Sequence, residues 1–286
     1  MNQRLQVHLT LARASNLPTV VSNVVCACLL SGQFTWLTTL CAAIAASLLY
    51  TGGIYLNDWK DADYDYKHRP ERPIPAQQIT RSAVGLWAAA YFLLGLSISC
   101  LINLSSFVWI VLLLACIIAY DLHHKENVYS PLLMAGCRAL IYPWGASLQS
   151  DGLSTGIAIA AIAAFSYTVG LSWIARKPSF CRQNPFRMSL LLAVPALLWL
   201  GYTWPSLSAA SVALLLAFAL WTAYSLSGLY RKLMQVGFTV QNLIAGLCVV
   251  DLLTIGFSGL LSPLSVLCFG TLLLTTVLLQ LKISGS

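Results

Sequence analysis

The sequence predicts an all-α fold, a polytopic bundle of transmembrane helices that forms a single domain over residues 1–286. Of these residues, 58% are hydrophobic and only 9% are charged, whereas soluble domains carry about 25% charged residues. Windows of about 20 apolar residues, long enough to cross a bilayer as helices, fill most of the length and leave no room for a separate soluble domain. Lys and Arg also gather in alternate connections between these windows, as expected for membrane-inserted helices.

Ten apolar segments, each bounded by polar connections, are the expected helices. Arg4 and Arg13 precede the first segment, and no small-residue cleavage site closes it. We therefore expect it to remain as a span rather than to be removed as a signal peptide. In chain order the segments are 17–30, 36–54, 84–102, 107–122, 130–148, 155–175, 188–202, 207–226, 239–257 and 263–281.

The connections between the segments alternate in charge and in length. The five connections 31–35, 103–106, 149–154, 203–206 and 258–262 are short and contain no Lys or Arg. The others hold Lys60, Lys67, Arg69, Arg72, Arg81, Lys125, Arg176, Lys177, Arg182, Arg187, Arg231 and Lys232, and Lys282 follows the last segment. By the positive-inside rule, both termini and the long polar loops are cytoplasmic, in the inner (plasma) membrane if the chain is bacterial.

The net charge of +7 does not by itself indicate an anionic partner. Inserted membrane proteins keep their basic residues on one side for topological reasons, so we expect no nucleic-acid partner. Long loops on a rigid scaffold commonly carry function. Any chemistry is therefore expected on the cytoplasmic face.

An aspartate cluster follows the second segment directly, in the stretch Asn57-Asp58-Trp-Lys-Asp61-Ala-Asp63-Tyr-Asp65. If the helix continues past Ile54, Asp58, Asp61 and Asp65 lie within about 60° of one another at 100° per residue. Asn57 flanks them and Asp63 points away. Three carboxylates therefore converge on one face.

Converging carboxylates at the edge of an apolar bundle take up protons unless a cation compensates their charge. Mg²⁺ suits such a place, because it prefers oxygen ligands and is commonly held by one or two carboxylates together with substrate phosphate oxygens. The charges alone also allow a simpler interpretation, a solvated helix end with the aspartates paired to nearby basic residues. The candidates for that pairing are Lys60, Lys67, Arg69 and Arg72.

The spacing Asn57-Asp58-x-x-Asp61-x-x-x-Asp65, followed by Arg69-Pro-Glu-Arg72-Pro-Ile-Pro75, resembles the first aspartate-rich motif of the UbiA superfamily of intramembrane prenyltransferases. Arg13 before the first segment, Tyr120-Asp121 with Lys125 after the fourth, and the long polar loops also fall where that family has them. The resemblance covers most of the chain and implies a UbiA-type bundle of nine core spans plus a tenth.

The resemblance also implies an activity and a set of partners. In such enzymes Mg²⁺ ions on the aspartates grip the diphosphate of an isoprenyl donor, and the allylic cation that forms is attacked by a small, often aromatic acceptor within the membrane. An apolar cavity among membrane lipids keeps water from the cation. Carried over, Asp58, Asp61 and Asp65 are the catalytic and metal-binding residues, Asn57 completes the metal and diphosphate site, and Arg72 and Lys125 contact phosphate oxygens.

The second aspartate-rich motif of that family, expected after the sixth segment, is missing. No acidic residue occurs between Gly152 and Val250, and Arg176 and Lys177 stand where the carboxylates belong. These two cations could bind the diphosphate directly. The segment ends in Ala-Arg, which resembles the ending in UbiA-like subgroups such as those of ebo gene clusters. Alternatively, the scaffold has lost turnover and binds or helps translocate a lipid or isoprenoid-related molecule, or the two residues only anchor the loop to the cytoplasmic side.

Three further polar residues lie in or at the end of the apolar segments. Arg138 is costly in hydrocarbon, so we expect it to face a cavity in the bundle and to bind substrate there, the alternative being that its side chain snorkels to the membrane surface. Asp251 is equally costly, and a buried partner such as Arg138 would explain it. Asp121 is either a metal ligand or the polar end of the fourth segment.

Overall fold

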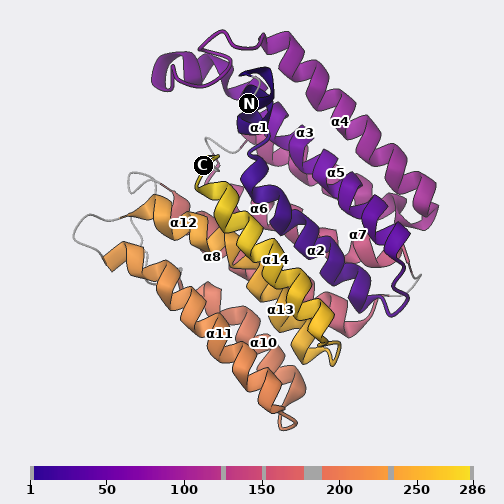
Figure 1. The fold of residues 1–286 in the computed structure, drawn as a ribbon. Coiled ribbons are helices and arrows are strands. Elements are labelled where there is room, and N and C mark those ends of the chain that lie inside the picture. Colours follow the sequence, from indigo (N-terminus) through magenta and orange to yellow (C-terminus); the bar gives the residue numbers. More distant parts are fainter. Residues whose placement is uncertain (1–2, 124–126, 150–152, 177–188, 231–234, 284–286) are drawn as a thin grey trace.

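The computed structural model is an all-helical bundle (Figure 1). It describes residues 3–123, 127–149, 153–176, 189–230 and 235–283. No strand occurs in these ranges. The helices are α1 (Gln3–Leu11), α2 (Leu17–Leu30), α3 (Trp36–His68), α4 (Arg81–Ile102), α5 (Phe107–His123), α6 (Ser130–Ala139), α7 (Ile141–Ser147), α8 (Thr155–Ala175), α10 (Val194–Thr203), α11 (Ala209–Leu226), α12 (Val236–Ala245), α13 (Leu247–Phe257) and α14 (Pro263–Gln280).

Several helices start at a hydroxyl side chain that accepts a hydrogen bond from a free backbone N–H of the first turn. Thr80 accepts from Ala83 N at the start of α4, and Ser154 accepts from Ile157 N at the start of α8. Ser262 forms a capping box with Ser265 at the start of α14. These caps explain why the helices begin where the polar connections end.

Each of the ten predicted segments is mainly helical over its described residues, although two are split into separate helices. The fifth is split at Leu140 into α6 and α7, because Pro143 has no N–H to continue the ladder. The ninth is split at Gly246 into α12 and α13. A Cβ at Gly246 would lie 2.3 Å from the Tyr167 hydroxyl, so the close approach of α8 requires glycine there.

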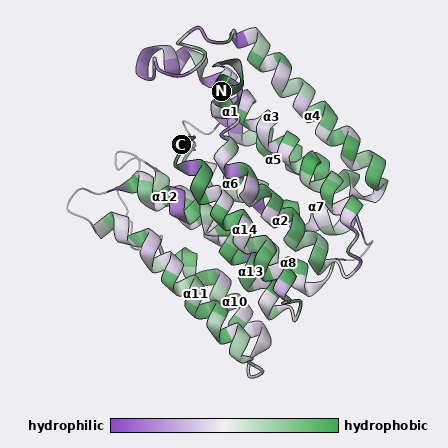
Figure 2. Cartoon of the chain, viewed as in Figure 1, coloured by the Kyte–Doolittle hydropathy of each residue, from purple (hydrophilic) through white to green (hydrophobic). Residues whose placement is uncertain are grey.

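Seven helical stretches in the described part of the chain are long and apolar enough to cross a membrane, and α2 and α10 belong to shorter apolar helices. This composition agrees with the predicted polytopic bundle, while the count of nine or ten crossings stays a prediction. Figure 2 shows the apolar ribbon along the bundle and hydrophilic ribbon gathered at the end where α1 and the α3–α4 turn lie. We call this end, which α3 reaches at Asp58–His68, the aspartate end.

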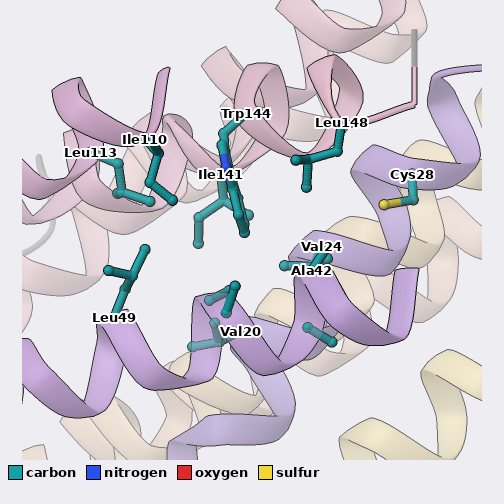
Figure 3. Packing of buried hydrophobic residues seen from close by; sticks show 13 residues of the cluster. Val20, Val24, Cys28, Ala42, Leu49, Ile110, Leu113, Ile141, Trp144 and Leu148 are labelled. Atoms are coloured by element: carbon teal, nitrogen blue, oxygen red, sulfur yellow. The ribbon is translucent and has the colours of Figure 1, made fainter. Parts of the chain in front are cut away.

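The core consists of apolar clusters, one of which joins the two halves of the chain. In the first half, Trp144 and Ile141 of α7 pack with Ile110 of α5, Val24 of α2 and Leu49 of α3 (Figure 3). A second cluster joins α8, α10, α11, α12 and α13. A third cluster includes residues of α2, α7, α8, α13 and α14, so α2 packs against elements of both halves.

Candidate diphosphate and metal site

Helix α3 continues past its apolar part to His68 and carries the aspartates on one turn after another. Asp58, Asp61 and Asp65 are only 6%, 8% and 2% exposed, and Asn57 is also buried. Asp63 points away: its side chain is 79% exposed and pairs with Arg81 at 3.2 Å. The predicted division of the four aspartates is therefore what the structure shows, although their role in binding metal stays a prediction.

Two arginines reach the buried carboxylates. Arg72, in the turn after α3, places Nη1 2.8 Å from Oδ1 of Asp58 and 3.4 Å from Oδ2 of Asp65. Arg13, between α1 and α2, lies with Nη2 3.8 Å from the same Oδ1 of Asp58. The pairing of Arg72 with aspartates was part of the simpler interpretation from sequence, but these carboxylates are enclosed rather than solvated.

The backbone of Arg13 is in the left-handed region, with φ 44° and ψ 49°. This conformation costs a non-glycine residue roughly 1–2 kcal/mol, and residues held in it tend to occur at functional sites. Here it directs the chain from α1 into α2 and leaves the guanidinium beside Asp58.

Helix α5 adds a fourth buried carboxylate, that of Asp121, to the aspartate end. Asn57 donates from Nδ2 to Oδ1 of Asp121 at 3.4 Å. Gly53 makes this approach possible, since a Cβ there would meet Cγ2 of Ile117 at 2.8 Å and Oδ2 of Asp121 at 3.7 Å. The sequence offered no reason to single out Gly53, because its neighbour on α5 is far along the chain.

Arg176, at the end of α8, is bound to the connection between α5 and α6. Its Nη2 donates to the backbone carbonyl of Asn127 at 2.8 Å and to Oγ of Ser130. The guanidinium also lies over the ring of Trp173, 5.3 Å from its centroid. Lys125 and Lys177, two other predicted substrate-binding residues, lie outside the described residues.

Arg138 and Asp251 do not form the direct pair expected from the sequence. Arg138 donates to Oδ1 of Asn23 at 2.8 Å and to Thr19, both on α2. Asp251 also bonds to Asn23, so one neutral amide separates the two charges. Asp251 therefore has buried partners, as the sequence suggested, but Arg138, the example given for them, reaches it only through Asn23 of α2.

The donor chemistry at the aspartate end fits Mg²⁺, which prefers carboxylate and amide oxygens. In the part of the chain that the structure describes, however, no three His, Cys, Asp or Glu side chains converge closely enough to hold a metal by themselves. An ion here would take its remaining ligands from phosphate oxygens and water, as Mg²⁺ usually does.

Comparison with known families connects this arrangement to a known fold. The model of the UbiA prenyltransferase family matches residues 16–242, which include α2, the aspartates, Arg72 and Arg176.

The chain belongs to the UbiA prenyltransferase family. Solved structures agree on the fold: a UbiA homologue from Aeropyrum pernix superimposes with a TM-score of 0.67 at 18% identity, over 82% of this chain and 94% of that one. A UbiA homologue from Archaeoglobus fulgidus, determined with GPP and Mg²⁺, gives 0.57 at 15% identity over 95% and 96%. The predicted all-α bundle of the UbiA type is thereby confirmed.

Curated relatives of this UbiA family member match over shorter stretches. Digeranylgeranylglyceryl phosphate synthase of Saccharolobus solfataricus is 32% identical over 133 residues, which is 46% of this chain and 47% of the relative. The enzyme of the same name from Methanothrix thermoacetophila is 34% identical over 110 residues, or 38% and 39%. The matched stretches thus span less than half the length of these relatives.

Proposed function

We propose that this protein is a Mg²⁺-dependent prenyltransferase of the membrane interior. It transfers an isoprenyl group from an isoprenyl diphosphate to a small, often aromatic acceptor. The observation that carries the proposal is the set of enclosed carboxylates on α3, Asp58, Asp61 and Asp65, with two arginines among them. Family membership and the synthase names of its relatives support it.

The residues at the aspartate end have different roles in binding a diphosphate. Asp58, Asp61 and Asp65 hold Mg²⁺, which supplies charge that stabilises the leaving diphosphate. Arg72 and Arg13 both pair with Asp58. From this position their guanidinium groups contact phosphate oxygens of the donor, because a planar guanidinium can donate two parallel hydrogen bonds to phosphate. Asn57 orients Asp121 through its amide.

The rest of the site follows from the same arrangement. Arg138 binds substrate from inside the bundle, and the apolar helices around it keep water from quenching an allylic cation. Arg176, with Lys125 and Lys177, supplies positive charge where the second acidic motif is absent, in the manner of the UbiA-like subgroups of ebo gene clusters. The aspartate end faces the cytoplasm, in the inner membrane if the chain is bacterial.

The purified protein in nanodiscs, titrated with radiolabelled geranyl diphosphate, tests this proposal. We expect binding that requires Mg²⁺ in the wild type and is lost in Asp61→Asn. Asp63→Asn is the matched control, since Asp63 is on the same helix but faces outward, and it should bind as the wild type does. Equal, metal-independent binding in all three proteins would refute the metal site.

Turnover is tested with the same donor and a panel of acceptors that includes phenols and a glycerol phosphate lipid, the latter chosen because the curated relatives are glyceryl phosphate synthases. We expect at least one acceptor to be prenylated by the wild type and Asp63→Asn, and none by Asp61→Asn. Binding without turnover on any acceptor would instead favour the second candidate.

The second candidate is a non-catalytic UbiA family member that binds or helps translocate a lipid or isoprenoid-related molecule. The absence of acidic residues between Gly152 and Val250 and the engagement of Arg176 with Asn127 and Ser130 favour it. In that case Asp61→Asn should complement a deletion strain, whereas substitutions that fill the bundle interior should not.

A further inference from the structure

A second group of polar side chains lies inside the bundle and is bonded through α2 rather than through the aspartates of α3. It joins α2 to α6, α7 and α13 and sits where hydropathy alone predicts only apolar packing. We call it the central polar cluster. Its members are Thr19, Ser22, Asn23, Arg138, Tyr142 and Asp251.

Asp251 is fully enclosed, with no exposed surface. Its Oδ2 accepts hydrogen bonds from Ser22 Oγ and from Asn23 Nδ2, the latter at 2.8 Å, and its Oδ1 accepts one from the Tyr142 hydroxyl. An ionised carboxylate can accept from all three of these groups, one amide N–H and two hydroxyls. A buried charge of this kind is costly unless an opposite charge compensates it.

Asn23 links that carboxylate to the basic member of the cluster. Its Oδ1 accepts from Nη1 of Arg138 at 2.8 Å, while its Nδ2 donates to Asp251 and, at 3.0 Å, to the Tyr142 hydroxyl. Turning the amide over would set Nδ2 against the guanidinium and Oδ1 against the carboxylate. Both contacts would be repulsive, so the two charges fix the amide orientation from opposite sides.

The two charged residues differ in how a substrate could reach them. Asp251 is sealed between α2, α7 and α13, whereas Arg138 is half-buried and near the break between α6 and α7. Only the arginine is therefore available to a ligand in the bundle interior. The guanidinium is held toward α2 by Asn23 and by Thr19, to which Nη2 donates at 3.3 Å.

We propose that Asp251 is a positioning residue that acts through the Asn23 amide to orient the Arg138 guanidinium and to compensate its charge. The role of Arg138 in substrate binding rests on the proposed function, while the link between the three residues rests on the contacts alone. The link transmits orientation because Asn23 has one amide orientation compatible with both charges. It also explains why α2 carries an asparagine in an apolar span.

An exchange of charge positions tests the link. Asp251→Asn leaves Arg138 without a counter-charge, and Asn23→Asp sets two carboxylates side by side, so each single variant should lower the melting midpoint in nanodiscs by roughly 10 °C. The double variant Asn23→Asp/Asp251→Asn places the carboxylate directly on Arg138, and we expect it to melt within a few degrees of the wild type. A double variant that is as unstable as the sum of the singles would overturn the proposal.

A neutral pair of substitutions keeps the test decisive if the single variants fail to fold. Arg138→Gln/Asp251→Asn removes both charges, so it should fold and melt well above Asp251→Asn if an uncompensated charge is the cause of the loss. If it fails to fold as well, or if Asp251→Asn alone melts like the wild type, Asp251 has no charge-compensating role. Ser225→Ala, which removes a buried hydroxyl that donates to the Trp221 carbonyl within its own helix, controls for the loss of a single buried hydrogen bond.

The positioning role has its own readout in folded protein. The Kd of geranyl diphosphate with Mg²⁺ should change less than twofold in Asp251→Asn, since the proposed donor site is formed by the aspartates of α3. The KM for an acceptor that the wild type prenylates should rise at least tenfold in Asp251→Asn, and the double variant Asn23→Asp/Asp251→Asn should return it to the wild-type value. An unchanged KM would show that Asp251 has only a structural role. If the wild-type protein shows no turnover, the proposed function is refuted, but the melting comparison still tests the link between Asp251, Asn23 and Arg138.

Discussion

Removal of Arg72 is expected to destabilise the protein, because the repulsion between Asp58 and Asp65 is then no longer compensated. The Arg72 side chain is 16% exposed, and its Nη1 lies 2.8 Å from Asp58 and 3.4 Å from Asp65. At an effective dielectric constant of about 20, a pair at the shorter distance is worth about 6 kcal/mol before desolvation. Removing one partner of a buried pair costs about 3–5 kcal/mol, so we expect Arg72→Gln to destabilise the protein by about 3 kcal/mol.

The assay is thermal unfolding in nanodiscs, with EDTA and then with Mg²⁺. A loss of about 3 kcal/mol corresponds to a fall in melting midpoint of about 6–12 °C. Mg²⁺ should restore part of this loss, because a cation bound among the carboxylates replaces the missing guanidinium charge. At ten times its dissociation constant, a ligand of the folded state adds about 1.4 kcal/mol.

The comparison between variant and wild type decides the reasoning. Arg72→Gln should show a larger Mg²⁺-dependent rise in melting midpoint than the wild type, in which Arg72 already compensates the aspartates. Asp63→Asn, which removes only the outward-facing partner of the Asp63–Arg81 pair, should change the midpoint by no more than a degree or two. If Arg72→Gln melts like the wild type in EDTA and gains nothing extra from Mg²⁺, the carboxylates are not under mutual repulsion.

Three more perturbations follow from the contacts at this end. Gly53→Leu should lower the free energy of unfolding by about 2–3 kcal/mol, because the side chain forces α5 away, and should weaken Mg²⁺-dependent donor binding. Gly270→Ala, where a Cβ meets nothing within 4 Å, is the control and should be neutral or stabilising by up to about 1 kcal/mol. Similar donor binding by both variants would contradict this. Arg13→Gly should be about 1 kcal/mol more stable than Arg13→Ala, because glycine relieves the left-handed backbone, and equal unfolding midpoints would show that no strain is stored. A double-mutant cycle of Arg176→Gln and Ser130→Ala should give a coupling of about 1–2 kcal/mol in the free energy of unfolding, and a coupling near zero would mean that Arg176 is not bound to that connection.

The helices and the aspartate face could be predicted from sequence because both depend on local periodicity. Apolar runs define spans through their length, and a spacing of three and four places Asp58, Asp61 and Asp65 on one side of α3 while Asp63 faces out. The break in the fifth span was not predicted, because hydropathy reads Pro143 as part of one apolar run, although its missing N–H is a local signal for a break.

The remaining features depend on contacts between distant parts of the chain. Asn23 and Asp251 are 228 positions apart, and no periodicity within α2 or α13 shows that they meet. The partners of Arg176 are a similar case, since neither Asn127, in the connection before α6, nor Ser130, the first residue of α6, lies near Arg176 in the sequence. Polar residues inside apolar spans signal that a partner exists, but only the packing of the helices identifies it.

The length of α3 has a consequence for how substrates arrive. From Trp36 to Asp58 the helix rises about 33 Å at 1.5 Å per residue, close to the thickness of the hydrocarbon core of a bilayer, about 30 Å. A helix of this length that starts with Trp36 at one membrane interface brings the carboxylates to the headgroup level of the other. Under the proposed function, an amphiphilic substrate would keep its phosphate in the water layer and its tail in the leaflet while it diffuses laterally to the site. Encounter would then be a two-dimensional search, and the rate would follow the mole fraction of substrate in the leaflet rather than its concentration in the surrounding solution.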